Sequence, residues 1–202
     1  MATTLPTGAD RRESLLDVAT KIVAAGDLDA LTMETVAIEA GVSRPLVYKH
    51  FANKGELLAA VYRREAAAFD AEVVAAVEAA SSLEDMLRAM LRAIFRGAGS
   101  RGGAFTILQR AAGRDATTRT EQRARDRRSV RFFAGVAAKE FGLGIREARA
   151  AMSVLLSGID AVVAQWRAHK GAGQEQYLED MYVALVLGAL ANMTEGPRAP
   201  AR

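Results

Sequence analysis

The sequence of 202 residues has no cysteine, and its only histidines are His50 and His169. Without thiols the chain can form neither disulfides nor thiolate metal sites, and two histidines are hard to assemble into a histidine metal cluster. We therefore predict that the protein binds no metal and uses no cofactor.

Long apolar runs are also missing. No stretch approaches the roughly 18 to 20 apolar residues that a membrane span needs, and the N-terminal segment MATTLPTGADRRE lacks the apolar core of a signal peptide. No grouping of serine, histidine and acid has the spacing of a known nucleophilic site, so we predict no catalytic residue. We expect a cytoplasmic protein that does not contact a membrane and is not an enzyme.

Negative charge is scarce in one segment. The whole chain carries a formal net charge of only +3, with a pI near 9.4. Residues 43–64, however, contain five lysines or arginines against a single acid, Glu56. Positive charge focused on one stretch indicates a polyanionic partner for that part of the chain. The five cations are Arg44, Lys49, Lys54, Arg63 and Arg64.

Helical periodicity dominates what is present, and no convincing strand competes with it. Leu15, Ala19 and Ile22 lie on one face of a helix that we expect over residues 11–25. The pattern predicts an all-α fold of about nine helices. After three short N-terminal helices, the longer ones are expected at 54–79, 83–96, 103–111, 116–140, 146–169 and 175–194.

The segment GVSRPLVYKHF, residues 41–51, joins two short helices. Thr32 can cap the first of them, and Gly41 can end it in a left-handed turn. Ser43 is placed to cap the second, where Pro45 falls in the first turn and loses no intrahelical hydrogen bond. Two short helices joined by a glycine turn predict a helix-turn-helix motif at about residues 32–52.

The second helix of such a motif enters the DNA major groove, so its exposed side chains are candidates for DNA contacts. Arg44 can bond guanine O6 and N7, and an exposed Leu46 can contact a thymine methyl group. The side chains one turn further on can bind phosphates. Each residue taken alone is more often a solvated surface side chain than a contact, and Tyr48 can be a half-buried core aromatic. The predicted DNA-binding residues are Thr32, Ser43, Arg44, Pro45, Leu46, Tyr48, Lys49, His50 and Lys54.

Residues 11 to 60 resemble the DNA-binding domain of the TetR family of transcriptional regulators. The residues that carry the resemblance are Leu31-Thr32, Ala37, Ala40-Gly41-Val42-Ser43, Tyr48, His50-Phe51, Asn53-Lys54 and Leu57-Leu58. The resemblance implies a homodimer that binds a pseudo-palindromic double-stranded DNA operator as a repressor and is released by a small-molecule effector. Two residues depart from the expected pattern: Leu46, where a small hydroxyl residue is common, and the acidic Glu34.

The rest of the chain gives fewer clues to chemistry. We expect a flexible N-terminus over 1–10, the helix-turn-helix domain over 11–57, an effector-binding and dimerisation domain over 58–195, and a flexible tail over 196–202. The helices at about 146–169 and 175–194 are apolar enough to bury a second face, which predicts dimerisation through them, although both can instead be central in a monomer. Candidate ligand contacts are Phe105, Gln109, Arg110 and Trp166.

GAGSRG, residues 97–102, matches a dinucleotide-binding pattern, but it follows an amphipathic helix where that fold needs a strand. We interpret it as a helix stop and a loop. The resemblance also implies a ligand cavity in the C-terminal domain, and the alternative to a regulator is a helical enzyme or interaction module that uses this cavity.

Overall fold

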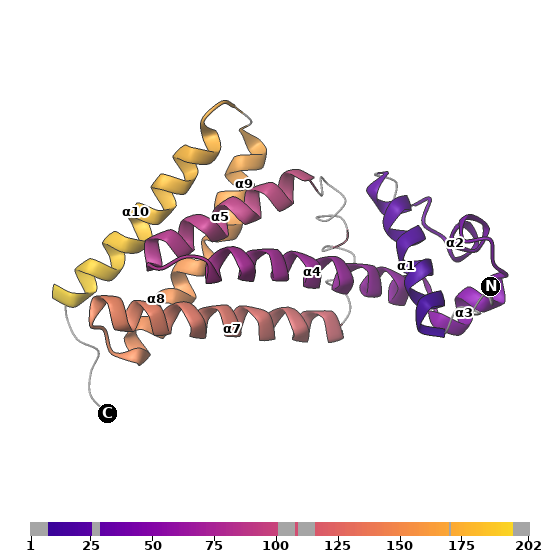
Figure 1. Ribbon diagram of the computed structural model, residues 1–202, viewed down its shortest axis with the longest axis horizontal. Helices are drawn as coiled ribbons and strands as arrows, with labels where there is room; N and C mark the ends of the chain where they lie inside the picture. Colours follow the sequence, from indigo (N-terminus) through magenta and orange to yellow (C-terminus); the bar gives the residue numbers. More distant parts are fainter. Residues whose placement is uncertain (1–7, 26–28, 101–107, 109–115, 170, 196–202) are drawn as a thin grey trace, which may run out of the picture. The chain divides into compact units, whose positions relative to one another are not determined.

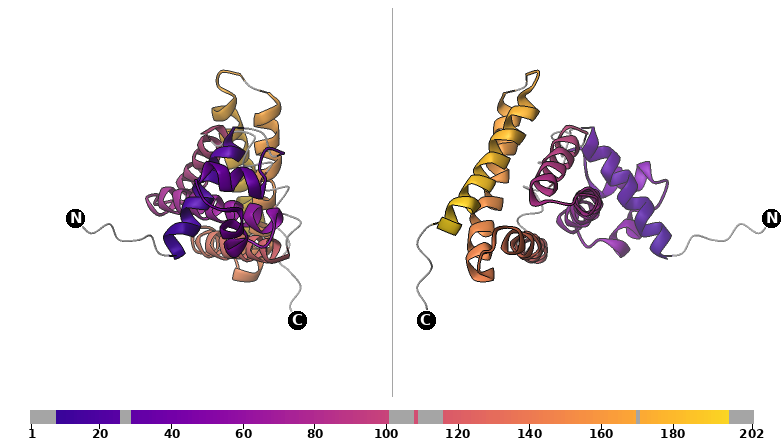
Figure 2. Two further views of the ribbon diagram at one scale, coloured as in Figure 1. Left: turned by 90° about the vertical axis from the view of Figure 1, so that its right-hand side faces the viewer. Right: turned by 60° about the vertical axis from the view of Figure 1, so that its left-hand side comes forward.

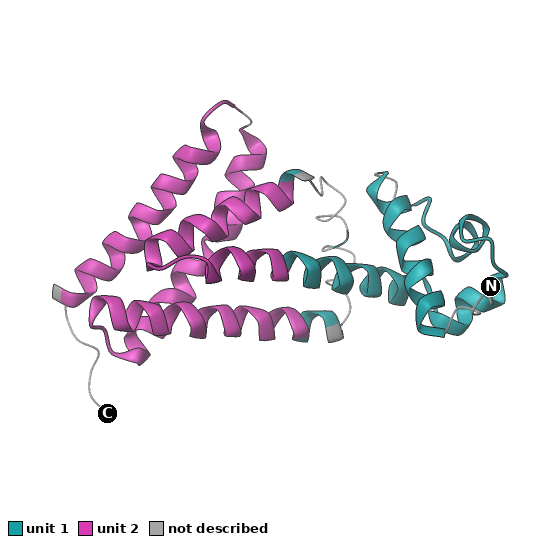
Figure 3. Cartoon of the chain, in the orientation of Figure 1, with its two compact units in different colours: residues 1–69, 99–120 teal, residues 70–98, 121–202 magenta. Residues whose placement is uncertain are grey.

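The computed structural model describes residues 8–25, 29–100, 108, 116–169 and 171–195, and within them all regular secondary structure is helical (Figure 1). Nine helices lie in this part of the chain. The predicted all-α fold class is therefore confirmed. The chain divides into two compact units, one of residues 1–69 and 99–120 and the other of residues 70–98 and 121–202 (Figure 3).

The first unit contains α1 (Gly8–Ala24), α2 (Met33–Glu39), α3 (Arg44–His50) and the first part of α4 (Lys54–Glu78). Its core is a continuous apolar cluster to which each of these helices contributes. Leu15 and Ala19 of α1 are fully buried, as is Val36 of α2. The short helices α2 and α3 are therefore held mainly by this shared core, because helices of about two turns are marginal alone.

Arg64 fastens α4 to α1 within this unit. Its Nη1 donates to Asp17 Oδ1 at 2.8 Å, and its Nη2 donates to Thr20 Oγ1 at 2.8 Å. Arg64, one of the five cations of residues 43–64, therefore pairs with side chains of α1 inside the unit and does not belong to the surface proposed to meet a polyanion.

The second unit packs the end of α4 with α8 (Ile145–Ser157), α9 (Ile159–Ala168), α10 (Gln174–Glu195) and most of two further helices, α5 (Leu83–Ser100) and α7 (Ala116–Phe141). Its core gathers Leu87 and Leu91 of α5 with Met152 of α8 and Val186 of α10. Figure 2 shows α10 running beside α8 and α9. The apolar faces of these helices are thus shared in one cluster.

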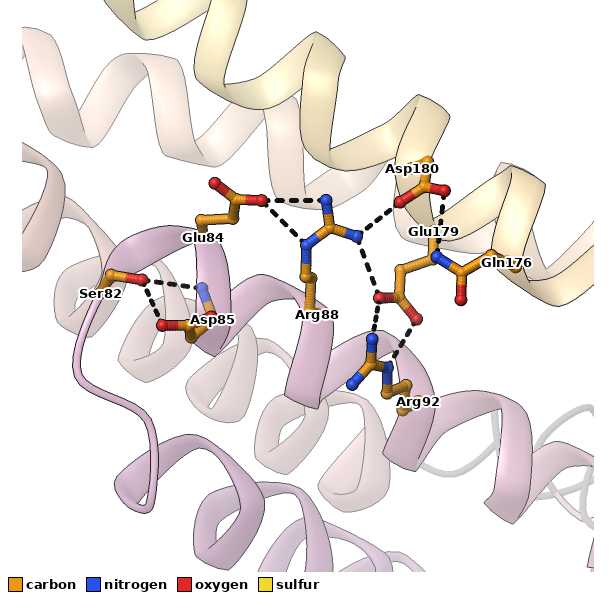
Figure 4. A network of polar contacts seen from close by, with 8 residues as sticks. All are labelled: Ser82, Glu84, Asp85, Arg88, Arg92, Gln176, Glu179 and Asp180. Carbon is orange, nitrogen blue, oxygen red and sulfur yellow. Dashed lines mark hydrogen bonds and ion pairs between the residues drawn. The ribbon is translucent and has the colours of Figure 1, made fainter.

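A network of charged side chains joins α5 to α10 (Figure 4). Glu179 accepts two hydrogen bonds from Arg92, with Nε at 2.8 Å from Oε2 and Nη2 at 2.7 Å from Oε1. Arg88 Nη1 donates to the same Oε1 at 3.1 Å and to Asp180 Oδ1 at 2.6 Å. Hydrogen bonds from Gln176 and then Arg88 lower the pKa of Asp180. The buried carboxylate of Glu179 is therefore fully compensated by two guanidinium groups.

The single helix expected over 146–169 is wrong, because the structure has two helices there. α8 ends at Ser157 and α9 begins at Ile159, with Gly158 between them. A Cβ at Gly158 would lie 3.1 Å from the Leu155 carbonyl oxygen and 3.6 Å from Tyr182 Cε2. Tyr182 donates its hydroxyl to that same carbonyl at 2.8 Å. The break is thus fixed by a contact with α10.

The interpretation of residues 97–102 as a helix stop is also wrong in part, since α5 continues through Gly97 to Ser100. The helix expected at 103–111 falls outside the described residues apart from residue 108, which is helical. α1 begins at Gly8, three residues before the expected start. The domain boundary at residues 57 and 58 stays a prediction. No helix in the described part of the chain has the length and apolarity that crossing a membrane requires.

Candidate nucleic-acid interface

The first helix of the predicted motif begins at a hydroxyl cap. Thr32 has extended backbone angles, and its Oγ1 accepts a hydrogen bond from the Thr35 backbone N–H at 3.0 Å. This satisfies one of the amide groups that the first turn leaves without a helical partner. Thr32 therefore caps α2, as predicted, and it is exposed.

Gly41 makes the turn between α2 and α3. Its φ is 64°, in the left-handed region that glycine enters without a Cβ clash. The next amide, from Val42, donates to the Ala37 carbonyl at 2.9 Å and closes the end of α2. The predicted glycine turn is therefore present, and it sets the direction in which α3 leaves α2.

α3 has one buried side and one exposed side. Val47 and, directly after the helix, Phe51 are fully buried against the first unit's core. Ser43 precedes the helix with extended backbone angles but makes no side-chain cap, and Pro45 lies in the first turn. With two anchors facing inward four residues apart, the opposite side of α3 faces outward.

The structure brings the predicted contact residues together around α3, with differing exposure. Tyr48 is 43% exposed, which excludes a core role for its ring. The prediction that Leu46 is exposed is wrong, because its side chain is half-buried beside the anchored Val47. The other exposed members are Thr32, Ser43, Arg44, Pro45 and Lys49, and the other half-buried members are His50 and Lys54.

Arg44 lies between an aromatic ring and an acid. Its Cζ is 5.8 Å from the centroid of the Tyr48 ring, and its Nη1 is 3.8 Å from Glu34 Oε2. The side-chain hydrogen bond with Tyr48, followed by the charges of Tyr48 and Glu34, raises the pKa of the Arg44 guanidinium. Arg44 is thus a permanent cation at the start of α3, where it is more than half exposed.

α4 begins at a reciprocal cap formed by Asn53 and Glu56. Asn53 Oδ1 accepts from the Glu56 backbone N–H at 2.9 Å, while Glu56 Oε2 accepts from the Ala52 N–H at 2.7 Å. Lys54 lies in this first turn, half-buried. The cap orients the start of α4 and places the Lys54 cation near its N-terminal amides.

Among the candidate ligand contacts, Phe105, Gln109 and Arg110 lie outside the described residues. Trp166, on α9, is half-buried and packs against Phe95, with the two rings tilted by 37° and their centroids 5.6 Å apart. Its Nε1 donates to Glu175 Oε1 at 3.1 Å. These contacts tie α9 to α5 and to the start of α10.

The sequence left open whether Glu34 points toward solvent or toward Arg44. The acid was noticed because a negative side chain near DNA is unexpected, but its direction depends on the angle between α2 and α3. Only the folded motif shows that Glu34 faces Arg44.

Residues 15–61 match the family model described as "Bacterial regulatory proteins, tetR family". The N-terminal domain belongs to the tetR family. This confirms the resemblance drawn from the same part of the sequence. Among curated relatives, the chain is 34% identical over 86 residues to the HTH-type transcriptional regulator BetI of Rhizobium meliloti (strain 1021). That match covers 43% of this chain and 42% of BetI, so the chain spans less than half the length of the curated relatives it matches.

Solved structures match over nearly the whole chain. A putative transcriptional regulator from Pseudomonas aeruginosa PAO1 is similar with a TM-score of 0.75 and 16% identity, covering 94% of each chain. This likeness shows the fold alone. The multidrug binding protein EbrR, solved in complex with imidazole, is similar with a TM-score of 0.63 and 26% identity, covering 87% of this chain and 89% of EbrR. The tetR-family domain is thus joined to a helical region whose fold also occurs in solved regulators.

Proposed function

We propose that this protein is a sequence-specific, DNA-binding transcriptional regulator that acts in the cytoplasm. The observation that carries the proposal is the outward face of α3, where Arg44, Tyr48 and Lys49 are exposed while Val47 and Phe51 anchor the helix from behind. A short helix held rigidly on one side and cationic on the other suits insertion into the major groove.

The side chains divide into two roles in this proposal. Arg44, at the N-terminal end of α3, bonds guanine O6 and N7, and Leu46 contacts base edges with the part of its side chain that is accessible. Lys49, His50 and Lys54 bind phosphates, which fixes the register of the helix without reading sequence. Thr32, Ser43, Pro45 and Tyr48 complete the surface that meets the DNA backbone.

Replacing Arg44 by alanine is expected to relax sequence preference at one base position of the operator. The loss of a bidentate guanine contact corresponds to about 1–3 kcal/mol of discrimination. The operator is first obtained by selection from random-sequence DNA with the wild-type protein. Affinities of both proteins for the operator and its single-base variants then measure the effect.

Lys54→Ala is the matched control because it also removes one cation, from a residue proposed to contact phosphate. It should weaken binding to all sequences alike and reduce the salt slope of log K by about one. If both substitutions left affinity and base preference unchanged, α3 and the start of α4 would not be the DNA-binding surface.

We further propose that the protein is a homodimer paired through α8, α9 and α10, within the regions 146–169 and 175–194. The support is the apolar surface that these helices leave uncovered: Val154 on α8 and Leu185 on α10 are 72% and 61% exposed. Tyr177 and Ala184 lie on the same side of α10 as Leu185 and are also exposed. Exposed apolar stripes of this kind favour self-association.

Leu185→Glu is expected to convert the dimer to a monomer. A two-fold interface brings equivalent patches together, so each substituted protein would place a carboxylate against the apolar stripe of its partner. Light scattering after size-exclusion chromatography measures the mass. Val74→Glu, on α4, introduces the same charge at another exposed apolar residue and should leave the mass unchanged. Equal masses for the two variants would contradict this interface.

The region over 58–195 is proposed to bind a small-molecule effector and to release the protein from its operator, so that it acts as a repressor. The support is the similarity of the fold to EbrR, whose solved complex contains imidazole. Phe105, Gln109, Arg110 and Trp166 stay the candidate contacts. Release is tested by adding small molecules to the protein–operator complex and measuring fluorescence anisotropy.

A further inference from the structure

An acid stands beside the arginine that we propose reads a base. Glu34 Oε2 lies 3.8 Å from Arg44 Nη1, and the two side chains are 66% and 57% exposed. The helix α3 itself, RPLVYKH, contains no acid, so this carboxylate comes from α2. A carboxylate on a surface that meets DNA is repelled by every phosphate, whatever the sequence.

The folded protein alone does not require this pair. Ion pairs between exposed side chains contribute little to stability, because both groups stay hydrated and their long side chains keep alternative rotamers. The contact with Arg44 therefore opens readily when a better partner for either group arrives. The Glu34 carboxylate thus weakens binding to DNA of any sequence and adds little to the stability of the fold. On the operator, a hydrogen-bond donor on a base can offset this repulsion.

The spacing of the two groups suits such a partner. Their 3.8 Å separation is close to the rise of about 3.4 Å between successive base pairs. At this spacing the Arg44 guanidinium can donate hydrogen bonds to one base pair while the Glu34 carboxylate accepts one from the next base pair. In the major groove, arginine donates to guanine O6 and N7, while a carboxylate accepts from the exocyclic N4 amino group of cytosine.

We propose that Glu34 is a specificity-determining residue that accepts a hydrogen bond from a cytosine in the base pair next to the guanine bound by Arg44. The inference rests on the proposed function of the α3 surface. Guanine and thymine present only acceptor atoms or a methyl group to the carboxylate, and on adenine the N6 amino donor stands beside the N7 acceptor, which repels it. Glu34 thus strengthens the distinction between the operator and other DNA by weakening binding to the other DNA.

Glu34→Gln tests the proposal because glutamine is nearly isosteric but pairs with adenine N6 and N7. We expect the preferred base beside the guanine to shift from cytosine to adenine by about tenfold, and the affinity for scrambled DNA to rise. The matched control is Glu39→Gln, an exposed acid five residues further along α2 and so about 140° around the helix. It makes the same change of net charge and should keep the cytosine preference.

Selection from random-sequence DNA with wild type and both variants gives the base preferences, and circular dichroism confirms that each variant is folded. A wild-type protein without any sequence preference would overturn the proposed function itself. A wild-type preference for guanine with no cytosine beside it, or retention of cytosine by Glu34→Gln, would overturn only the role of Glu34. A variant that lost guanine preference while keeping cytosine would assign Glu34 to positioning Arg44, which also contradicts direct readout.

Discussion

Replacing Phe51 by alanine is expected to destabilise the first unit by about 3–5 kcal/mol and thereby abolish operator binding. The Phe51 ring is fully buried at the end of α3, in the same cluster as Leu15 and Val47. The guanidinium of Arg12 lies 4.9 Å from its centroid, so this contact with α1 is lost as well. Because α3 spans only two turns, little else holds it in place.

Hydrogen exchange measured by mass spectrometry checks this prediction at the level of single segments. Peptides from α1, α2 and α3 should lose protection in Phe51→Ala. The control is Phe132→Ala on α7, which removes the same ring from an exposed position and should change the free energy of unfolding by less than about 1 kcal/mol. Unchanged protection of α3 in Phe51→Ala would show that the buried ring does not hold the helix.

Replacing Glu179 by glutamine is expected to lower the free energy of unfolding by about 2–3 kcal/mol. The Glu179 side chain is only 3% exposed, and its carboxylate compensates Arg88 and Arg92 together. Removing one member of a buried ion pair lowers stability by about 3–5 kcal/mol, because the other charge is left buried without compensation. The expected loss is smaller here because both guanidinium groups are partly exposed and water can solvate them.

Urea unfolding followed by Trp166 fluorescence measures this loss, since the only tryptophan of the chain packs on Phe95 in the same unit. Glu84→Gln is the control: Glu84 pairs with the same Arg88 at 2.9 Å but is 46% exposed, so the loss should stay below about 1 kcal/mol. Equal losses in the two variants would mean that burial of the Glu179 carboxylate contributes nothing.

The sequence predicts the N-terminal motif well because local chemistry decides it. Gly41 sets the turn, and Thr32 and Asn53 cap the helices that follow them, so each feature depends on residues only a few positions apart. The spacing of Val47 and Phe51 likewise predicts the buried side of α3, and both are buried.

What could not be predicted depends on residues far apart in the chain. Arg64 counts as a surface cation in the sequence, but its partner Asp17 lies 47 residues away on α1. Glu179 stands in an apolar run whose sequence predicts a second buried face but gives no partner for the acid, and only the packing of α5 on α10 supplies its two arginines. The break at Gly158 depends in the same way on Tyr182 of another helix.

The most direct measurement is the affinity of the purified protein for the DNA flanking its own gene and for scrambled DNA, by fluorescence anisotropy across a salt series. The account predicts binding to one flanking sequence at least about 10³-fold tighter than to scrambled DNA at physiological salt, with the difference surviving competitor DNA. Weak binding that is equal for both DNAs and disappears as salt rises would contradict it, because the α3 surface would then be a basic patch without sequence preference.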